Sequence, residues 1–325
     1  FNNMGVPGAK SFHLGAAGYG NVAGVAVGLA NPYYARMASS PNATVIGDAM
    51  SQNPSFFSLW IGNNDILGFA TSGGAGEDQT GNFDPTTYGG NDITDPNVFA
   101  SVYNGLLGGL ASTGAKGIVA NIPSVTSIPY FTTVPYNAIP LDAATAGAVN
   151  QGYAPYNGGI QQALAALTGT GLFTAEEAAK RTITFTAGQN AVVIIDEDLT
   201  DLGAINPAFA ALPKYRQATA EDLLVLTSRT FLGTVVNNNP QLINGVSVPL
   251  ADKWVLTPEE QEAVEVARTS YNQTIKALAT QYDVAFYDAD QGLLDLLTGI
   301  SQNGITTTAV YATGGGFSLD GVHPS

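Results

Sequence analysis

The chain of 325 residues contains no cysteine, few charged side chains and only two histidines. Without cysteine there is no disulfide framework, no thiolate nucleophile and no cysteine-ligated metal, which argues against redox chemistry. A catalytic imidazole base would have to be His13 or His323. No run of 18 or more apolar residues occurs, and the first residues lack the layout of a signal peptide, so no membrane-spanning helix is predicted.

Charge is scarce and mostly negative. Asp, Glu, Lys and Arg make up 11% of the chain, against about 25% in an average soluble domain. The 26 acidic and 11 basic residues leave a net charge of −15, which repels phosphate backbones and argues against a nucleic-acid partner. Surface polarity must come from neutral side chains, a composition typical of exported proteins.

Strands and helices alternate at both ends of the chain. An apolar run at 55–61 predicts a buried strand, and a helix capped by Asp95 and a strand at 117–122 follow it. Thr257 and Glu260 form a capping box before a second amphipathic helix, which leads into a strand at 284–287. This alternation predicts parallel βαβ units, in which ligands bind beyond the carboxyl ends of the strands.

The alternation lapses between about residues 127 and 250, which we interpret as an insertion. It contains a helix capped at Thr174, alternating runs at 182–186 and 191–195, and an Asn244-Gly245 dipeptide that predicts a two-residue hairpin turn. Its aromatic residues either line an acyl pocket or pack the core of the insertion; they are Tyr130, Phe131, Tyr136, Tyr153 and Tyr156.

Three short motifs carry chemistry. Asp320 stands three residues before His323, a compact arrangement for half of a catalytic triad. A Gly-Asn-Asn-Asp sequence at 62–65 closes the first predicted strand, and Asn-Met-Gly-Val-Pro-Gly at 3–8 resembles the end of a strand running into a glycine turn. Each motif also has a plainer interpretation, as a turn in which Asx side chains bond the backbone or glycine supplies a positive φ.

Together and in this order, the three motifs resemble the second, third and fifth blocks of the SGNH, or GDSL, family of serine esterases and lipases. The resemblance implies one α/β domain over residues 1–325. Its expected fold is a three-layer α/β/α sandwich on a doubly wound, flavodoxin-like parallel sheet, carrying the large mid-chain insertion at 127–250.

The resemblance also implies a reaction, the hydrolysis of carboxylic esters through an acyl-enzyme. Gly8 would donate its backbone N–H to the oxyanion and Asn64 its side-chain amide. His323 would act as general base and acid, with Asp320 orienting its imidazole. No metal or cofactor is implied, and the substrate would be a small-molecule or lipid ester.

The serine of the family's first block has no counterpart in the sequence. In a sheet of order 2-1-3-4-5, the strand that leads to this serine lies between two others, so its loss would leave two strand edges unpaired. We therefore expect residues upstream of Phe1 in the intact protein, and both ends to be trimmed. The resemblance suggests a secreted or bacterial envelope protein. An outer-membrane lipoprotein of this kind would associate with the membrane only through an upstream lipid anchor.

Three alternatives remain open from the sequence. If the nucleophile is truly absent, the same pocket would belong to an inactive ester- or glycan-binding surface protein. The Gly, Asn and Thr content also suits a structural surface protein. The Asx-rich loop at 77–95 offers oxygen ligands for Ca²⁺, although its spacing is not that of an EF-hand and turn formation explains the same composition. His13 is interpreted as a residue of a helix face or first turn and is left out of the site.

Overall fold

The computed structural model describes residues Asn2 to Ser325, and the chain divides into two compact units. Unit 1 comprises residues 1–70, 76–125 and 262–308, and unit 2 comprises 71–75, 126–261 and 309–325. The principal segment of unit 2 thus begins one residue before the expected insertion and extends eleven residues beyond it. Each unit is compact in itself.

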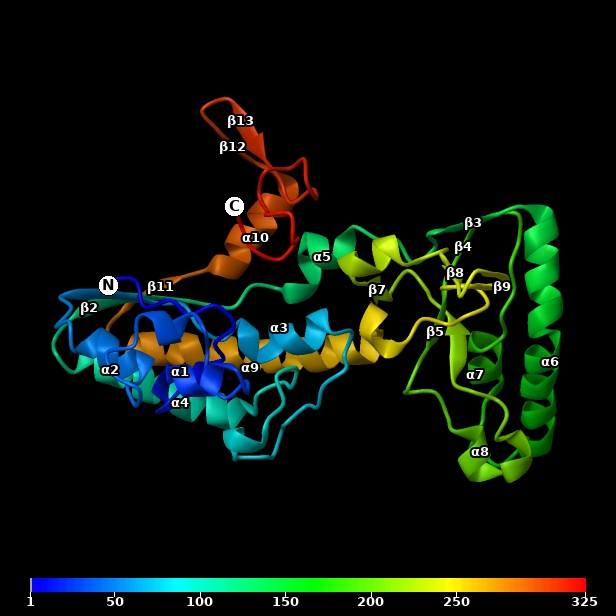
Figure 1. The fold of residues 1–325 in the computed structure, drawn as a ribbon, viewed down its shortest axis with the longest axis horizontal. Helices are drawn as coiled ribbons and strands as arrows, with labels where there is room; N and C mark the ends of the chain where they lie inside the picture. Colours follow the sequence, from blue (N-terminus) through cyan, green and yellow to red (C-terminus); the bar gives the residue numbers. More distant parts are fainter. Residues whose placement is uncertain (1) are drawn as a thin grey trace. The chain divides into compact units, whose positions relative to one another are not determined.

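Unit 1 is built on a three-stranded parallel sheet in the order β1-β2-β11. Figure 1 shows helices α2, α4 and α9 on one side of this sheet. The elements, of which α3 ends and α9 begins in unit 2, are α1 (Val22–Val25), α2 (Val45–Met50), β1 (Phe56–Leu59), α3 (Asn64–Thr71), α4 (Pro96–Ala111), β2 (Lys116–Ala120), α9 (Pro258–Gln281), β11 (Ala285–Tyr287), α10 (Ala289–Thr298), β12 (Ile300–Gln302) and β13 (Ile305–Thr307).

The predicted βαβ units are confirmed. The Asp95 side chain caps α4 by accepting hydrogen bonds from the backbone of Asn97 and Val98. At the start of α9 the Glu260 carboxylate accepts from the Thr257 N–H at 2.6 Å, the capping box that the sequence predicts. The α/β class is therefore established, while the SGNH type and the three-layer arrangement remain predictions.

Both edge strands of the sheet, β1 and β11, have a single partner among the described strands, and beside β1 part of one face is uncovered as well. Strand β1 pairs with β2 alone among the described strands. Phe57 and Leu59 are buried, but Phe56 and Trp60, which alternate to the other face, are 62% and 52% exposed. Apolar side chains on an unpaired edge strand are costly in water, so this edge is suited to a further strand.

The strand ending expected at residues 3–8 is not found. Residues 2–6 form no strand, and Phe1 lies outside the described residues. The Asn3 side chain instead accepts a hydrogen bond from the Gly5 N–H at 2.9 Å, a local Asx turn. A strand is stabilised by its neighbours, and no described strand pairs with this segment.

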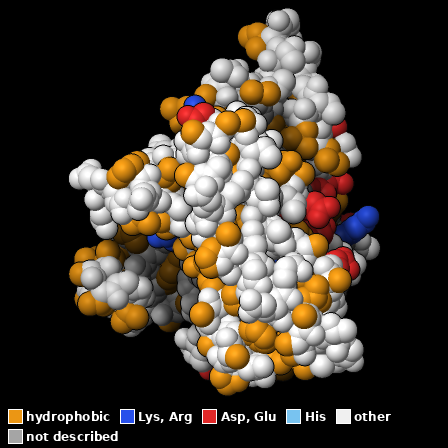
Figure 2. All heavy atoms as spheres, turned by 90° about the vertical axis from the view of Figure 1, so that its right-hand side faces the viewer, with side chains coloured by type: hydrophobic (Ala, Val, Ile, Leu, Met, Phe, Trp, Pro, Cys, Tyr) orange, Lys and Arg blue, Asp and Glu red, His pale blue; other side chains and the backbone are white. Residues whose placement is uncertain are grey.

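Unit 2 has only two-stranded ladders among the described residues. Its elements are α5 (Pro129–Thr132), β3 (Ile139–Leu141), α6 (Ala143–Leu167), α7 (Ala175–Lys180), β4 (Gly188–Asn190), β5 (Val193–Ile195), α8 (Leu202–Ile205), β6 (Tyr215–Gln217), β7 (Leu223–Leu224), β8 (Val235–Val236), β9 (Asn239–Ile243) and β10 (Val255–Leu256). Seen from the α6 side, its surface is mostly neutral, as the low charge requires (Figure 2).

The predicted hairpin turn is wrong in position. The two-residue turn joins β8 to β9 at Asn237 and Asn238, whose φ angles are 51° and 57°. A type I′ turn needs positive φ at both central residues, which Asn tolerates. At the expected site only Gly245 has a positive φ, 78°, and its turn leads from β9 into the core of unit 2.

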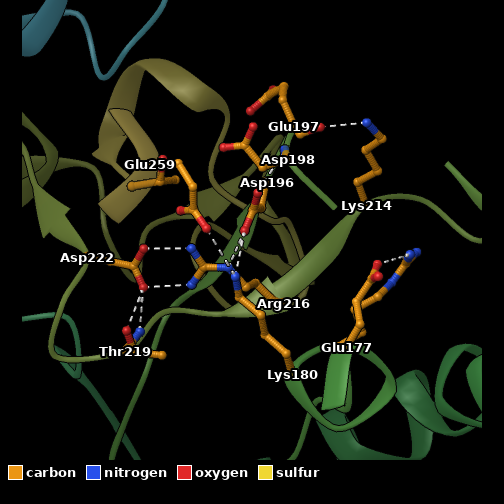
Figure 3. Close-up of polar contacts among 12 residues, drawn as sticks. Glu177, Lys180, Asp196, Glu197, Asp198, Lys214, Arg216, Thr219, Asp222 and Glu259 are labelled. Carbon is orange, nitrogen blue, oxygen red and sulfur yellow. Dashed lines mark hydrogen bonds and ion pairs between the residues drawn. The ribbon is translucent and has the colours of Figure 1, made fainter. Parts of the chain in front are cut away.

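An ion cluster lies in the core of unit 2. Arg216, 1% exposed, makes two hydrogen bonds to Asp222, at 2.6 and 2.7 Å, and one to Asp196 (Figure 3). Burial opposes the charged form, but these two carboxylates outweigh it and raise the pKa of Arg216 above its usual range. Three elements of unit 2 therefore meet at one guanidinium.

Candidate active site

Asp320 and His323 lie in one tight loop of unit 2. The Nδ1 atom of His323 is 2.7 Å from a carboxylate oxygen of Asp320. The other carboxylate oxygen accepts from the backbone N–H groups of Val322 and His323, at 2.8 and 3.0 Å. The Asx turn that the plainer interpretation expected and the pairing that a triad needs therefore occur together.

The imidazole is presented to solvent. The His323 side chain is 74% exposed and that of Asp320 is 50% exposed. Partial burial disfavours the ionised form of Asp320 and so raises its pKa. Hydrogen bonds from Ser318, from the backbone of the loop and from His323 outweigh this and hold the pKa of Asp320 well below its usual range. Asp320 is thus ionised at neutral pH and can fix the tautomer in which Nε2 of His323 accepts a proton.

The loop is anchored through Gly321, which has a φ of 73°. Its carbonyl accepts from the backbone N–H of Tyr130 in α5 at 2.9 Å. A Cβ at this position would lie 3.0 Å from both Tyr130 N and a methyl group of Leu226. Glycine is therefore required here by backbone conformation and by close packing.

Gly8 lies in a turn of unit 1 that Ala9 closes by donating to the Val6 carbonyl at 3.2 Å. Gly8 has a φ of 74° and is exposed, and apart from Pro7 and Ala9 no described residue lies within 4 Å of a Cβ built on it. Its N–H makes no hydrogen bond within the described residues. An open amide on a glycine turn suits an oxyanion donor.

Asn64 joins this turn. It is the first residue of α3, directly after the loop that ends β1, and its Nδ2 atom donates to the Ala9 carbonyl at 3.0 Å. An amide nitrogen carries two hydrogens, so one remains for another acceptor. The two proposed oxyanion donors, Gly8 and Asn64, are therefore neighbours in unit 1.

The sequence did not reveal how this turn is held. Asp65 is fully buried and accepts from the N–H and the hydroxyl of Ser11, at 2.8 and 2.7 Å. Burial raises the pKa of Asp65 to about 6, although Ser11 and Lys10 favour its ionised form. The ammonium of Lys10 is itself buried and donates to the carbonyls of Asp92 and Gly89. The position of Asp65 directly after Asn64 was the only available signal.

His13 lies in the first turn after Lys10, as interpreted from the sequence. Its Nδ1 atom accepts from the Lys10 N–H at 3.0 Å, and its ring stacks on Tyr19 at 4.5 Å. Burial and the charge of Lys10 lower the pKa of His13 to about 4. His13 is thus neutral at pH 7 and serves the packing of the turn.

Gly8 and Asn64 belong to unit 1, and Asp320 and His323 belong to unit 2. Within each unit the two members of the pair lie together: the amide donors through Ala9, the imidazole and carboxylate through a direct contact.

The carboxylates of the Asx-rich loop mainly bind the loop itself. Asp92 accepts from the backbone of Glu77 and Gly89, at 3.1 and 2.7 Å. Asp95 accepts from the Gly81 N–H at 2.8 Å besides capping α4. From Asn2 to Ser325, no group of three or more His, Asp or Glu side chains is arranged to hold a metal ion.

Most of the aromatic cluster packs the core of unit 2. Phe131 and Tyr153 are 1% and 8% exposed, and the Tyr153 hydroxyl donates to the Val246 carbonyl at 2.6 Å. Tyr136 and Tyr156 pack against the same core. Tyr130, whose backbone holds Gly321, is the member next to the His323 loop.

The chain matches no protein-family model, no curated protein and no solved structure. Among the described helices, none is both long and apolar enough to cross a membrane.

Proposed function

We propose that this chain belongs to a serine hydrolase that cleaves carboxylic esters through an acyl-enzyme. The observation that carries the proposal is the 2.7 Å contact between Asp320 and an exposed His323 imidazole. A carboxylate held ionised beside an imidazole whose second nitrogen is free is the arrangement a general base needs.

The Gly8 turn supports the same reaction. When a nucleophile attacks an ester, the carbonyl oxygen becomes an oxyanion that neutral N–H donors stabilise. Gly8 supplies an unpaired backbone N–H and Asn64 a spare amide hydrogen, and the Ala9 carbonyl keeps the two together.

The nucleophile in this proposal is a serine outside the sequence, in a segment that pairs with the open edge of β1. His323 removes the proton from its hydroxyl as the oxygen attacks the ester carbonyl. The protonated imidazole then gives that proton to the leaving alcohol, and a water molecule repeats the sequence to release the acid.

The test is hydrolysis of p-nitrophenyl acetate by the natural full-length protein, together with labelling by a fluorophosphonate. We expect a burst of nitrophenol, one labelled serine upstream of Phe1, and loss of both turnover and labelling in His323→Ala. Asn64→Ala should lower kcat by roughly 10²- to 10³-fold, the cost of one oxyanion donor, without loss of folding by circular dichroism.

A folded protein with neither turnover nor labelling would overturn the hydrolase and favour the ester- or glycan-binding protein. A labelled serine within residues 1–325 would show that the nucleophile has been assigned to the wrong segment. Gln151→Ala, an exposed substitution on α6, is the control and should leave both turnover and labelling unchanged.

A further inference from the structure

An uncharged, apolar loop of unit 1 projects its side chains into solvent. No Asp, Glu, Lys or Arg occurs between Lys10 and Arg36. Four large apolar side chains of residues 22–33, which we call the apolar loop, are 53–79% exposed: Val22, Val27, Leu29 and Tyr33. Exposed apolar side chains gathered on one segment mark an interaction surface.

The backbone of the apolar loop is well held, so this exposure is a fixed feature. Leu29 donates to the Gly24 carbonyl at 2.9 Å, and Asn31 donates to that of Tyr19 at 2.8 Å. The Asn31 carboxamide oxygen accepts from the N–H groups of Tyr33 and Tyr34. The apolar side chains are therefore displayed on a closed loop.

The apolar loop is joined to the proposed oxyanion turn. The Asn31 side chain donates to the carbonyl of Pro7, the residue before Gly8, at 2.9 Å, and to the Tyr19 hydroxyl at 3.0 Å. A surface that binds this loop therefore comes close to Gly8.

We propose that the apolar loop docks onto a neutral lipid surface and delivers lipid esters to the Gly8 turn. This inference rests on the proposed function and narrows its substrate class to esters carried in a membrane or lipid aggregate. Aliphatic tips with a tyrosine beside them match the boundary between acyl chains and headgroups.

The charge of the chain favours a neutral lipid surface over other occupants of the apolar loop. The loop has no cation to bind anionic headgroups, and the net charge of −15 repels them, so zwitterionic or neutral lipid is favoured. The same charge repels a second copy of the chain. Aliphatic tips without polar side chains offer a glycan few hydrogen bonds.

The absence of cysteine allows a direct test in the natural full-length protein. Leu29→Cys is labelled with bimane, and Val266→Cys, at a position on α9 that is 63% exposed, is the matched control. With phosphatidylcholine vesicles we expect the label at 29 to shift to the blue and to be quenched by brominated lipid. The label at 266 should do neither.

Three outcomes would overturn the proposal: no change at position 29, equal changes at both positions, or a shift at 29 without lipid that grows with protein concentration, which would assign the loop to a second copy. Turnover plays no part in this readout, so a failed hydrolase and a failed docking surface are distinguishable. As a second measurement, Leu29→Asp should lower hydrolysis of a long-chain ester in these vesicles roughly tenfold relative to Val266→Asp.

Discussion

The two units satisfy their buried backbone in different ways. In unit 1 a parallel sheet pairs β1, β2 and β11 directly. In unit 2 the extended segment at 182–186 lies outside every described strand, and carboxamide side chains pair with it instead. Asn157 both accepts from and donates to the backbone of Ile183, at 3.0 and 2.8 Å, and Asn150 does the same for Phe185.

In a chain with so little charge, neutral carboxamide side chains can pair with buried backbone groups. Asn150 and Asn157 are two turns apart on one face of α6, so each amide reaches the next inward-facing residue of the extended segment. A carboxamide offers the same donor and acceptor as a neighbouring strand. Unit 1 uses this pairing at Ile122, just after β2, where Asn272 of α9 accepts from the backbone N–H at 2.8 Å and donates to the carbonyl at 2.9 Å. Unit 2 uses it at two positions of one extended segment that has no strand partner, so substitutions of its carboxamides should affect it more.

The largest effect should follow from Arg216→Ala. It would leave Asp196 and Asp222 buried without their cation, and removing one partner of a buried ion pair costs about 3–5 kcal/mol. The chain has one tryptophan in each unit, Trp60 and Trp254. In variants that keep only one of them, chemical denaturation should show unit 2 losing stability far more than unit 1.

The matching control is Lys116→Ala, an exposed lysine of unit 1 paired with Asp283 at 3.2 Å; the two side chains are 73% and 93% exposed. Exposed ion pairs contribute about 0–1 kcal/mol to stability. The denaturation transition of this variant should therefore shift little. Equal shifts of both tryptophan signals for Arg216→Ala would mean that the two units unfold together, and the comparison between them would fail.

A smaller effect is expected from Asn157→Ala. The N–H and C=O groups of Ile183 would lose their partner while the Ile183 side chain stays 1% exposed. A buried polar group without a hydrogen bond costs about 1–3 kcal/mol. The free energy of unfolding followed by Trp254 should fall by that amount and the denaturation midpoint with it, and Gln151→Ala on the same helix should leave both unchanged. An unchanged midpoint for Asn157→Ala would show that the carboxamide pairing contributes nothing.

The strands and helices of unit 1 could be predicted because each carries a local signal. Alternating or continuous apolar residues and a capping side chain suffice for β1, α4 and α9. The 25-residue α6 was missed because it contains Pro155 and four glycines, all poor helix formers. Burial of one face, including Ile160 and Ala163, stabilises it regardless of propensity.

The candidate site, too, could be predicted from the sequence only in part. Asp320 and His323 are three residues apart, so their pairing can be read from the sequence. The support of the Gly8 turn cannot, because Asp65 reaches Ser11 across 54 positions and Lys10 reaches Asp92 across 82. Such contacts exist only once the chain has folded, and the composition does not distinguish these residues from others of their type.

The smallest effect concerns pH and again separates the units. Burial, with the nearby Asp252 and Glu197 carboxylates, raises the pKa of Glu260 in unit 2 to about 8, although Thr257 favours the ionised form. The folded state therefore holds a proton that the unfolded state releases above pH 4.5. This contribution is complete below pH 4.5 and is lost as pH rises toward 8.

Glu260→Gln should flatten this dependence, because a carboxamide keeps the neutral shape without titrating. Between pH 5 and 8 the melting temperature followed by Trp254 should fall by a few degrees in the natural protein, since 1 kcal/mol corresponds to about 2–4 °C at this size. His13 in unit 1 has the opposite sign: its pKa of about 4 gives stability that is present above pH 6.5 and lost toward pH 4. A Trp254 signal that falls equally in Glu260→Gln would assign the dependence to other groups, of which Asp252, with a pKa raised to about 6 by burial and by Glu197, is the first to test.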